Sequence, residues 1–513
     1  MPRAAWGGPA IAAWLSIFVL AALLNAGGYR FGASDQAFYV PAVAHHADPS
    51  LFPRDWAILG QQDELNAFTP LAGWVVRALG VPLPALFLAL HLATLALLGM
   101  GALALGGALS PSRWTAAAIL SALALRHAVA LGAVNTLEGY MHPRVLAFAL
   151  GTLAIAALLR RRPVAVVALV GAAFVVHPTT AVWFGVMAGT ALMVAEPRWR
   201  PWVGAAAVAA LLVSAWAVSL GPLAPRMVRM DPEWLSVLQG KRYLFPDRWP
   251  ASAWAIVALY AAVIGVVYRL RSRAGLVSAQ ESGVAAGVAA LLAILAASLP
   301  FSFARVAFAV QLQVPRVLWL VDLVAVVYVV WWLVEGRRAR PPKPDGRRRS
   351  AAVALVILAL ALARGSYVTF VEHPERAVLQ ADLPATAWNR ALGWIADHTP
   401  AGALVLADPG HAWRHGTSVR VGARRDVVLE EVKDSAMAMY SREIAVRVLD
   451  RVRALADFES LTAARARALA ARYGAGVLVT THDLDLPLLH REGSFRIYAT
   501  TEGTTKNSKA TKN

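Results

Sequence analysis

The chain has 513 residues, of which 58% are hydrophobic and only 16% are charged, and its formal net charge is +18. Charged residues this scarce and apolar residues this frequent exclude a soluble basic protein, and arginines dispersed over short loops argue against a folded surface for nucleic acid. The absence of cysteine excludes disulfides, thiolate metal sites and cysteine nucleophiles.

The charged residues divide the chain into two parts. Residues 366–513 hold 36 of the 80 charged side chains, whereas residues 1–365 hold only 44. The first part has the composition of a membrane domain and the second that of a soluble domain. We therefore predict a polytopic α-helical membrane domain over 1–365, a linker over 366–384, a small α/β domain over 385–500 and a disordered polar tail over 501–513.

Apolar runs long enough to cross a bilayer recur through the first part. A membrane helix needs about 20 mostly apolar residues. The sequence predicts about eleven such helices, at 10–27, 83–108, 114–133, 143–159, 164–177, 180–195, 202–220, 251–269, 283–300, 316–335 and 350–365. The two short helices around 164–195 are expected to form a tight hairpin that turns at HPTT (177–180).

The basic residues of short loops predict how these helices are oriented. Lysine and arginine concentrate in cytoplasmic loops. With the N-terminus in the cytoplasm, alternate loops collect 17 of the 49 basic residues, in segments 1–9, 109–113, 160–163, 196–201, 269–282 and 336–349. This orientation places loops 28–82 and 221–250 and the C-terminal domain outside the cytoplasm. The first helix is expected to be a retained anchor rather than a cleaved signal peptide.

Asp35 is the first candidate functional residue. It follows the first predicted helix closely, in the segment YRFGASDQAFYV (29–40), with aromatic side chains, Tyr39 among them, on both sides. An acid in partly apolar surroundings tends to have a raised pKa, which suits a general base. The alternative is a structural role, because Ser34 or Asp35 could also cap the N-terminus of a short helix.

The second predicted outer loop, NTLEGYMHPR (135–144), gathers polar residues between two apolar helices. The proline after His142 suits the first turn of a helix, so Arg144 is expected near a helix N-terminus, where a cation is unfavourable. Arg144 therefore needs an anionic partner, which is either Glu138 or a bound phosphate.

Further basic residues are expected on the same side. Arg305 and Arg316 lie in the amphipathic segment 300–316, which is expected in the membrane interface, where both could bind an anionic head group. Arg126 and His127 are expected late in the third helix.

A divalent metal ion, Mg²⁺ or Mn²⁺, is a further candidate ligand. Its donors would be Asp35, Glu138 and His142, with His45 or His46 in addition. No spacing among these residues is diagnostic of a metal site.

Five segments carry a resemblance to a known family: SDQAFYVPAVAHHADPSLFPRD (34–55), EGYMHPRVLAFALG (138–151), HPTTAVWF (177–184), QLQVPRVLWL (311–320) and WNRALGWIADHTPAGALVLADP (388–409). With the predicted helices and outer domain, they resemble the GT-C superfamily, which comprises polytopic glycosyltransferases that use polyprenyl-phosphate-linked sugars. Oligosaccharyltransferases and protein mannosyltransferases belong to it, and the chain looks most like a little-characterised bacterial branch. The resemblance implies a multi-pass protein of the cell envelope, in the inner (plasma) membrane.

By this resemblance, Asp35 matches the catalytic acid of the family's first loop, and Glu138 matches its second acid. Many relatives have paired acids where this sequence has Asp35 followed by Gln36, so a metal-bound and a metal-free site both remain open.

The implied reaction is transfer of a sugar from a polyprenyl-phosphate-linked donor to an acceptor hydroxyl on the outer face of the membrane. Such a transfer needs a base for the hydroxyl and cations for the departing phosphate. We expect Asp35 to be the base and Glu138 to orient it or to bind a metal. The candidate substrate-binding residues are Tyr39, His142, Arg144, Arg305 and Arg316.

Two other functions remain open. One is a catalytically inactive GT-C-like scaffold, which the sequence separates poorly from an enzyme. The other is a lipid or solute transporter, which should show internal repeats or broken helices that meet at the middle of the membrane. The sequence shows no convincing repeat.

The C-terminal domain is predicted to contain a small layered α/β fold. Helices are predicted at 386–398, 441–456 and 459–473, strands at 402–409, 474–481 and 495–500, and two short strands around a basic turn within 418–432. The domain has no glycine-rich phosphate motif, and DLDL (483–486) is expected to start a loop rather than to bind metal. The polar residues His411, His415, Lys433 and Asp434 are expected at its surface, from where they could reach a substrate.

Overall fold

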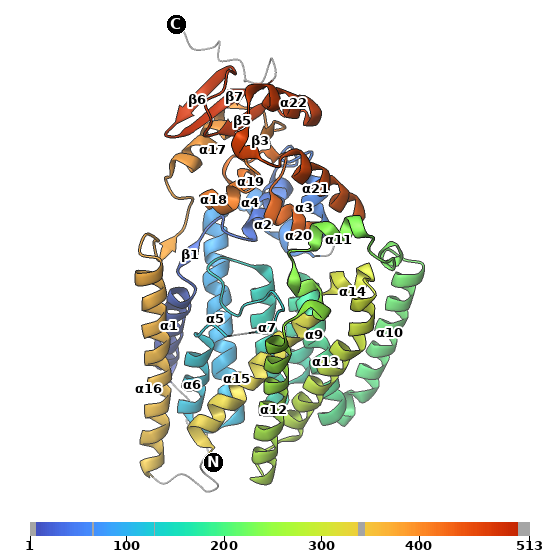
Figure 1. Cartoon of the computed structure of the whole chain (residues 1–513). Coiled ribbons are helices and arrows are strands. Elements are labelled where there is room, and N and C mark those ends of the chain that lie inside the picture. The colour runs from blue at the N-terminus through green and yellow to red at the C-terminus, as the bar shows by residue number, and fades with distance from the viewer. Residues whose placement is uncertain (1–6, 64–65, 128, 337–343, 501–513) are drawn as a thin grey trace. The chain divides into compact units, whose positions relative to one another are not determined.

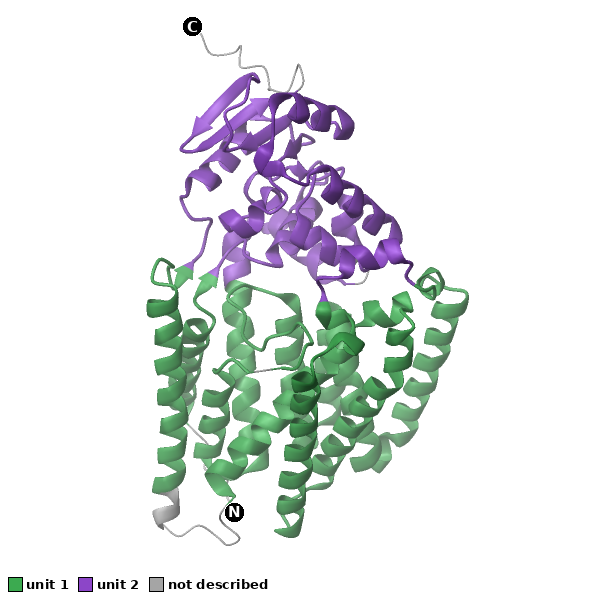
Figure 2. Cartoon of the chain, in the orientation of Figure 1, with its two compact units in different colours: residues 1–29, 89–229, 242–379 green, residues 30–88, 230–241, 380–513 purple. Residues whose placement is uncertain are grey.

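The computed structural model describes residues 7–63, 66–127, 129–336 and 344–500. The chain divides into two compact units of three segments each (Figure 2). Unit 1 comprises residues 1–29, 89–229 and 242–379, and unit 2 comprises residues 30–88, 230–241 and 380–513. The predicted disordered tail at 501–513 and the predicted basic loop residues 1–6 and 337–343 lie outside the described residues.

Unit 1 is built of helices (Figure 1). They are α1 (Gly8–Asn25), α5 (Leu83–Leu109, with residues 89–109 in this unit), α6 (Arg113–Leu123), α7 (Pro143–Leu159), α8 (Pro163–Val176), α9 (Pro178–Ala195), α10 (Arg200–Ser219), α12 (Ala251–Arg273), α13 (Ala279–Phe303), α14 (Ala307–Leu312), α15 (Val317–Glu335) and α16 (Pro344–Tyr367). The short strands β1 (Tyr29–Arg30) and β2 (Leu379–Gln380) pair with each other.

Within the described residues, eight helical stretches are long and apolar enough to cross a membrane, in α1, α5, α9, α10, α12, α13, α15 and α16. Two shorter apolar helices, α7 and α8, complete the set, and they are joined to α9 by the predicted break at His177. We therefore treat the chain as a multi-pass membrane protein. Ten of the eleven predicted membrane helices fall on these ten elements.

The exception is the predicted helix 114–133. Helix α6 ends at Leu123, and the described residues between it and α7, 124–127 and 129–142, form no helix. His127 is the physical reason, because its Nε2 lies 2.9 Å from the carbonyl oxygen of Ala122 and its Nδ1 lies 3.2 Å from the carboxylate of Asp322 in α15. The expectation that Arg126 and His127 lie within the third helix is therefore wrong.

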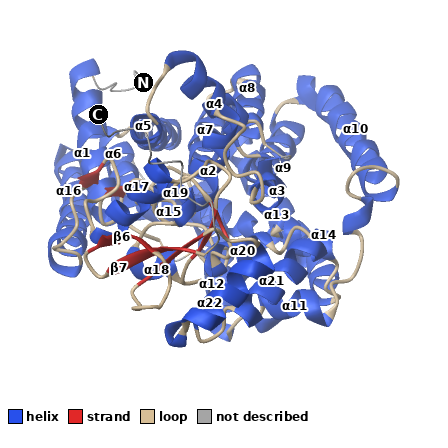
Figure 3. Ribbon diagram, turned by 90° about the horizontal axis from the view of Figure 1, so that it is seen from above, coloured by secondary structure: helices blue, strands red, loops and turns tan. Residues whose placement is uncertain are grey.

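Helix α15 organises the centre of unit 1. It is the most buried of the eight membrane-length stretches, whereas α10 is the least buried and stands at the rim in the view from above (Figure 3). Trp319 of α15 stacks on Phe148 of α7 at 3.9 Å between ring centroids, and its Nε1 donates to Thr136 Oγ1 at 2.9 Å. Trp319 and Asp322 thus fix the non-helical segment that carries Glu138 and His142.

Unit 2 contains a five-stranded sheet in the order β4-β3-β5-β7-β6. Its strands are β3 (Leu404–Leu406), β4 (Asp426–Val427), β5 (Val477–Thr480), β6 (Leu488–Glu492) and β7 (Phe495–Ala499). Strand β3 runs parallel to β4 and β5, and β7 runs antiparallel to β5 and β6. The sheet core is apolar and includes Trp388, Leu392, Val405 and Ile497.

The helices of unit 2 come from all three of its segments: α2 (Gln36–Ala47), α3 (Trp56–Asp63), α4 (Phe68–Leu79), α11 (Pro232–Leu238), α17 (Ala387–His398), α18 (His411–His415), α19 (Val419–Gly422), α20 (Glu431–Met437), α21 (Arg442–Ala454) and α22 (Ala463–Tyr473). The unit is therefore larger than the predicted domain 385–500, because residues 30–88 and 230–241 fold with it.

Most predicted elements of the C-terminal domain are confirmed, but segment 418–432 is not. In place of two strands it forms α19, the two-residue strand β4 and the start of α20. The Arg420 side chain is fully buried and binds Asp55 and Asp434, so partners distant in sequence decide the local conformation. Strand β6 was also not predicted.

Candidate functional site

Asp35 stands at the N-terminus of α2, after a tight turn. Gly32 has φ of +78°, and its N–H donates to Gln36 Oε1 at 2.6 Å. A Cβ at Gly32 would lie 2.9 Å from the Leu383 side chain, so glycine is needed here. Asp35 occupies the N-cap position but makes no capping hydrogen bond through its side chain. The capping alternative therefore does not explain this acid.

The carboxylate of Asp35 is bound by a lysine from another segment of unit 2. Lys433 Nζ lies 2.7 Å from Asp35 Oδ1 and 3.4 Å from Ser34 Oγ, and it lies 5.8 Å from the centre of the Phe38 ring. The two side chains are 15% (Lys433) and 26% (Asp35) exposed. The pair is therefore partly open to solvent and to small solutes.

A second lysine lies near this pair. Lys241 Nζ donates to the carbonyl oxygen of Val432 at 3.0 Å. Burial lowers the pKa of Lys241, the charge of Lys433 lowers it further, and the carboxylate of Asp35 opposes both effects. Asp35 thus has a cationic setting: Lys433 binds it, and the charge of Lys241 acts on it as well, while Glu431 also acts on Lys241.

Lys433 is held in place by its neighbour Asp434, which belongs to a buried ionic network. Arg420 donates to both oxygens of Asp434, at 2.6 and 3.0 Å, and to Asp55 Oδ2 at 2.8 Å. All three side chains are fully buried. A buried pair with this many hydrogen bonds fixes the backbone of α20, and with it the base of the Lys433 side chain.

The same network contains two carboxyl groups that favour the protonated form. Burial raises the pKa of Glu430 to about 7, against the opposing effect of Arg420, whose guanidinium is 3.8 Å away. Burial, together with the charge of Asp55, raises the pKa of Asp426 to about 6. Carboxyls outnumber their cationic partners here, and protons balance part of the excess charge.

Glu138 and Arg144, in unit 1, form a buried ion pair at the start of α7. Their side chains are 3% and 9% exposed, respectively. His142 is the N-cap of α7, and its Nδ1 accepts from Arg144 N at 3.1 Å. The predicted anionic partner of Arg144 is therefore Glu138. The second oxygen of Glu138 is buried and has no hydrogen-bond partner among the described residues.

His177 joins this group, although the sequence indicated only a turn there. It is the N-cap of α9, its Nδ1 accepts from Thr180 N at 3.3 Å, and its ring centre lies 6.2 Å from that of His142. Burial lowers the pKa of His177 well below its usual range, and the nearby charges of Arg316 and Arg144 lower it further. The sequence signals were the pairing of His with Pro before a helix at both 142–143 and 177–178, and the place of HPTTAVWF (177–184) among the segments that carry the resemblance.

We call these residues the basic cluster: Glu138, His142, Arg144, His177 and Arg316. Two of its members are arginines, and its two histidines cap the N-termini of helices, where anions are favoured. The cluster brings together four of the predicted site residues and adds His177.

Two predicted substrate-binding residues do not join either group. Arg305 forms a two-pronged ion pair with Asp247, at 2.9 and 2.6 Å, and lies over the Phe245 ring. Tyr39 is buried in unit 2, edge-on to Phe68 with ring centres 6.3 Å apart. Arg305 is thus already neutralised, and Tyr39 packs in the interior of its unit.

The C-terminal polar residues are less exposed than expected. His411 is buried, its Nδ1 lies 2.7 Å from the carbonyl oxygen of Asp408, and burial lowers its pKa to about 3. Asp434 is buried against Arg420, and Lys433 binds Asp35. The expected surface location is wrong for His411 and Asp434.

The proposed metal donors do not fit a divalent ion. No group of three or more His, Asp or Glu side chains suited to a metal occurs in the part of the chain that the structure describes. Asp35 faces a lysine and Glu138 faces an arginine. His46 binds Asp63 at 2.6 Å, and His45 stacks on Trp56 at 3.9 Å. A metal on the bound oxygen of Asp35 or of Glu138 would displace an existing cation.

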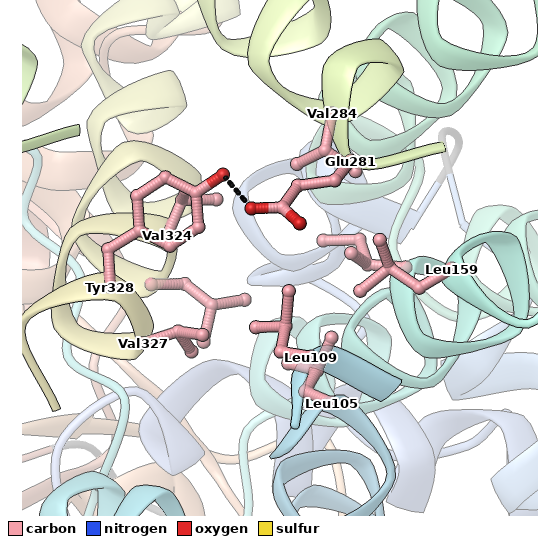
Figure 4. A pocket seen from close by; sticks show the side chains of 10 residues that line it. Leu105, Leu109, Leu159, Glu281, Val284, Val324, Val327 and Tyr328 are labelled. Atoms are coloured by element: carbon pink, nitrogen blue, oxygen red, sulfur yellow. Dashed lines mark hydrogen bonds between the residues drawn. The ribbon is translucent and has the colours of Figure 1, made fainter. Parts of the chain in front are cut away.

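A small cavity in unit 1 is not a substrate site. It has a volume of about 20 Å³, room for about one water molecule, and leucine and valine side chains of α5, α7, α13 and α15 line it (Figure 4). Glu281 at its edge is bound by Arg271 and accepts from Tyr328 Oη at 3.1 Å. The cavity cannot hold a sugar or a lipid chain.

No family model and no curated protein matches this chain. Among solved structures, it is similar to the archaeal oligosaccharyltransferase AglB from Archaeoglobus fulgidus, in complex with an inhibitory peptide and a dolichol-phosphate. The TM-score is 0.44 and the sequence identity 12%, with 92% of this chain and 70% of that chain covered. A likeness this weak carries no argument about function, which rests on the residues themselves.

Proposed function

We propose that the chain is a membrane glycosyltransferase that moves a sugar from a polyprenyl-phosphate-linked donor to an acceptor hydroxyl. The observation that carries the proposal is the setting of Asp35: a partly exposed acid at a tight turn, freed from helix capping and held by a lysine. The resemblance of segment 34–55 to the first loop of GT-C enzymes supports the proposal, because it implies a catalytic acid at the same residue.

In the proposed reaction, Asp35 accepts the proton of the acceptor hydroxyl. A bond forms between the acceptor oxygen and the anomeric carbon of the sugar, and the bond from that carbon to the phosphate oxygen breaks. The polyprenyl phosphate leaves with the bonding electron pair. Each step of this transfer conserves charge and needs no oxidant or further reactant.

Within unit 1, the basic cluster is by itself suited to bind an anion. Arg144 and Arg316 supply positive charge, and the two histidines mark helix N-termini, where an anion such as phosphate is favoured. The proposed role of Glu138 is to hold Arg144 in place. Arg305 has no part in this proposal, because Asp247 already neutralises it.

The ion pairs also favour a second candidate, the catalytically inactive scaffold. Both proposed acids are already bound by a cation, Asp35 by Lys433 and Glu138 by Arg144. In a scaffold these pairs would serve only the fold. Transfer activity decides between the two candidates.

The test is a transfer assay with the purified full-length chain in lipid vesicles and a panel of polyprenyl monophosphate sugars. The matched variants are Asp35→Asn and, as a control of similar exposure elsewhere in unit 2, Asp231→Asn, whose side chain binds Arg442. We expect transfer by wild type and by Asp231→Asn, and its loss in Asp35→Asn. Equal transfer by all three proteins would remove Asp35 from the mechanism, and a wild-type chain inactive with every donor would favour the scaffold.

A further inference from the structure

The residues around Asp35 also indicate which group supplies the positive charge beside this acid. A carboxylate that works beside an anionic donor needs a cation nearby, and a divalent metal is the usual supplier. Here the donors do not form a metal site, whereas Lys433 Nζ lies 2.7 Å from Asp35 Oδ1. A metal on this oxygen would have to displace the ammonium.

We propose that Lys433 is a positioning residue for Asp35, and that its ammonium supplies the positive charge that a metal would otherwise provide. This inference rests on the proposed function, since it assigns a role within the same transfer. Lys433 fixes one carboxylate oxygen by a charge-assisted hydrogen bond and so orients the carboxylate toward the hydroxyl that it deprotonates.

The fold holds Lys433 in place, unlike an ordinary lysine at a protein surface. Lys433 directly precedes Asp434, which Arg420 holds in the buried network with Asp55. Asp55 lies in the same segment of the chain as Asp35. One network therefore fixes both the segment that carries Asp35 and the helix that carries Lys433. It keeps the two side chains within bonding distance of each other.

Lys241 provides the natural comparison. It lies in the same cationic setting, but its Nζ donates to the carbonyl oxygen of Val432 rather than to Asp35. Removing Lys241 takes away a charge without removing the bond to Asp35. Variants of the two lysines therefore separate the general effect of positive charge from the specific bond between Lys433 and Asp35.

The first arm of the test does not depend on activity. Free Mn²⁺ is titrated with the full-length chain in detergent and followed by its electron paramagnetic resonance signal. We expect no binding at micromolar Mn²⁺, in wild type or in Asp35→Asn. Stoichiometric Mn²⁺ binding by wild type that disappears in Asp35→Asn would overturn the inference, because a metal would then hold Asp35.

The second arm uses chemical rescue of transfer. Lys433→Ala should lower kcat about 10- to 100-fold, as loss of a positioning partner does at comparable sites. Propylammonium, which restores the missing carbons and the ammonium, should recover at least a third of the lost activity. Tetramethylammonium, which carries the charge but no N–H donor, should not. Lys433→Arg should keep most of the activity.

Lys241→Ala is the matched control. It should lower kcat by about threefold or less, in keeping with a screened charge effect, and propylammonium should leave it unchanged. Lys433→Ala with wild-type activity, or without rescue despite an unchanged melting temperature, would overturn the inference. If wild type transfers no sugar at all, the proposed function fails, while the Mn²⁺ arm still decides between ammonium and metal at Asp35.

Discussion

Asp35 and Glu138 are both acids with a cationic partner, but they differ in their access to solvent. The Asp35–Lys433 pair is 26% and 15% exposed, whereas the Glu138–Arg144 pair is 3% and 9% exposed. A partly exposed pair contributes little to stability and can exchange partners with a substrate. A buried pair is costly to break, because either charge left alone is poorly solvated.

Under the proposed function, this difference suits the two acids to different tasks. Asp35 is suited to chemistry, because its carboxylate is partly exposed. Glu138 is suited to structure, since it holds Arg144 within the basic cluster. Substitutions should therefore separate the two, with activity lost at one site and stability at the other.

The largest expected effect is the loss of transfer in Asp35→Asn. The amide preserves size but cannot accept the proton, so kcat should fall about 100- to 10,000-fold. The apparent melting temperature should change little, because an exposed ion pair contributes only about 0–1 kcal/mol. Both quantities are measured on the same preparation in one detergent. A variant that loses stability as much as activity would contradict the contrast between the two acids.

The next effect is on stability, at the buried pair. Arg144→Met leaves the carboxylate of Glu138 buried without its cation and should cost about 3–5 kcal/mol of unfolding free energy. The double variant Glu138→Gln/Arg144→Met should regain part of this loss, because no buried charge remains. Denaturant unfolding in detergent measures both. A double variant less stable than Arg144→Met would show that the pair is not the source of the loss.

Glu430 extends the comparison to a third acid, which is buried and whose raised pKa favours its neutral form. Its pKa is raised to about 7 from an ordinary value of 4.5. The folded protein therefore binds more protons between these values, and the stability from this group is complete below pH 4.5 and lost as pH rises through 7. From pH 5 to pH 8, wild type should lose roughly 2–3 kcal/mol relative to Glu430→Gln.

The measurement is the difference in unfolding free energy between these two proteins across that pH range. Titrating groups distant from Glu430 are common to both proteins and cancel in the difference. Parallel curves from pH 5 to pH 8 would mean that Glu430 is ionised in the fold.

The smallest expected effect is at Arg305, whose pair with Asp247 is partly exposed. Arg305→Gln should change the unfolding free energy by less than about 1 kcal/mol. It should change transfer by about twofold or less, since Arg305 is already neutralised. Kinetics with a polyprenyl phosphate sugar that wild type uses checks this. A large rise in KM would return Arg305 to the phosphate-binding residues.

Elements set by local pattern were predicted well. The amphipathic helix expected at 386–398 is α17, Ala387–His398, and the apolar runs expected to be membrane helices fall on helices in ten of eleven cases. Elements set by distant partners were not. Helix α6 stops where His127 meets Asp322, and 418–432 follows the buried contacts of Arg420.

The candidate site shows the same division. The residues Asp35, Glu138, His142 and Arg144 stand out in the sequence because polar groups there interrupt apolar runs. His177 did not stand out, because it lies 35 residues from His142 along the chain and only packing places their rings 6.2 Å apart. Lys433 and Asp35 are separated by 398 residues and meet through a 2.7 Å bond.

By itself the sequence determines that this is a multi-pass membrane protein, because composition and the length of apolar runs decide which segments can cross a bilayer. It also determines which polar residues need an explanation. Only the tertiary structure decides the distant partners, a lysine for Asp35 and an aspartate for Arg305. For Arg144 the sequence offered Glu138 or a phosphate, and the structure selects Glu138. Ion pairs depend on distances between side chains, and for the two distant pairs those distances are set by the packing of segments far apart in the chain.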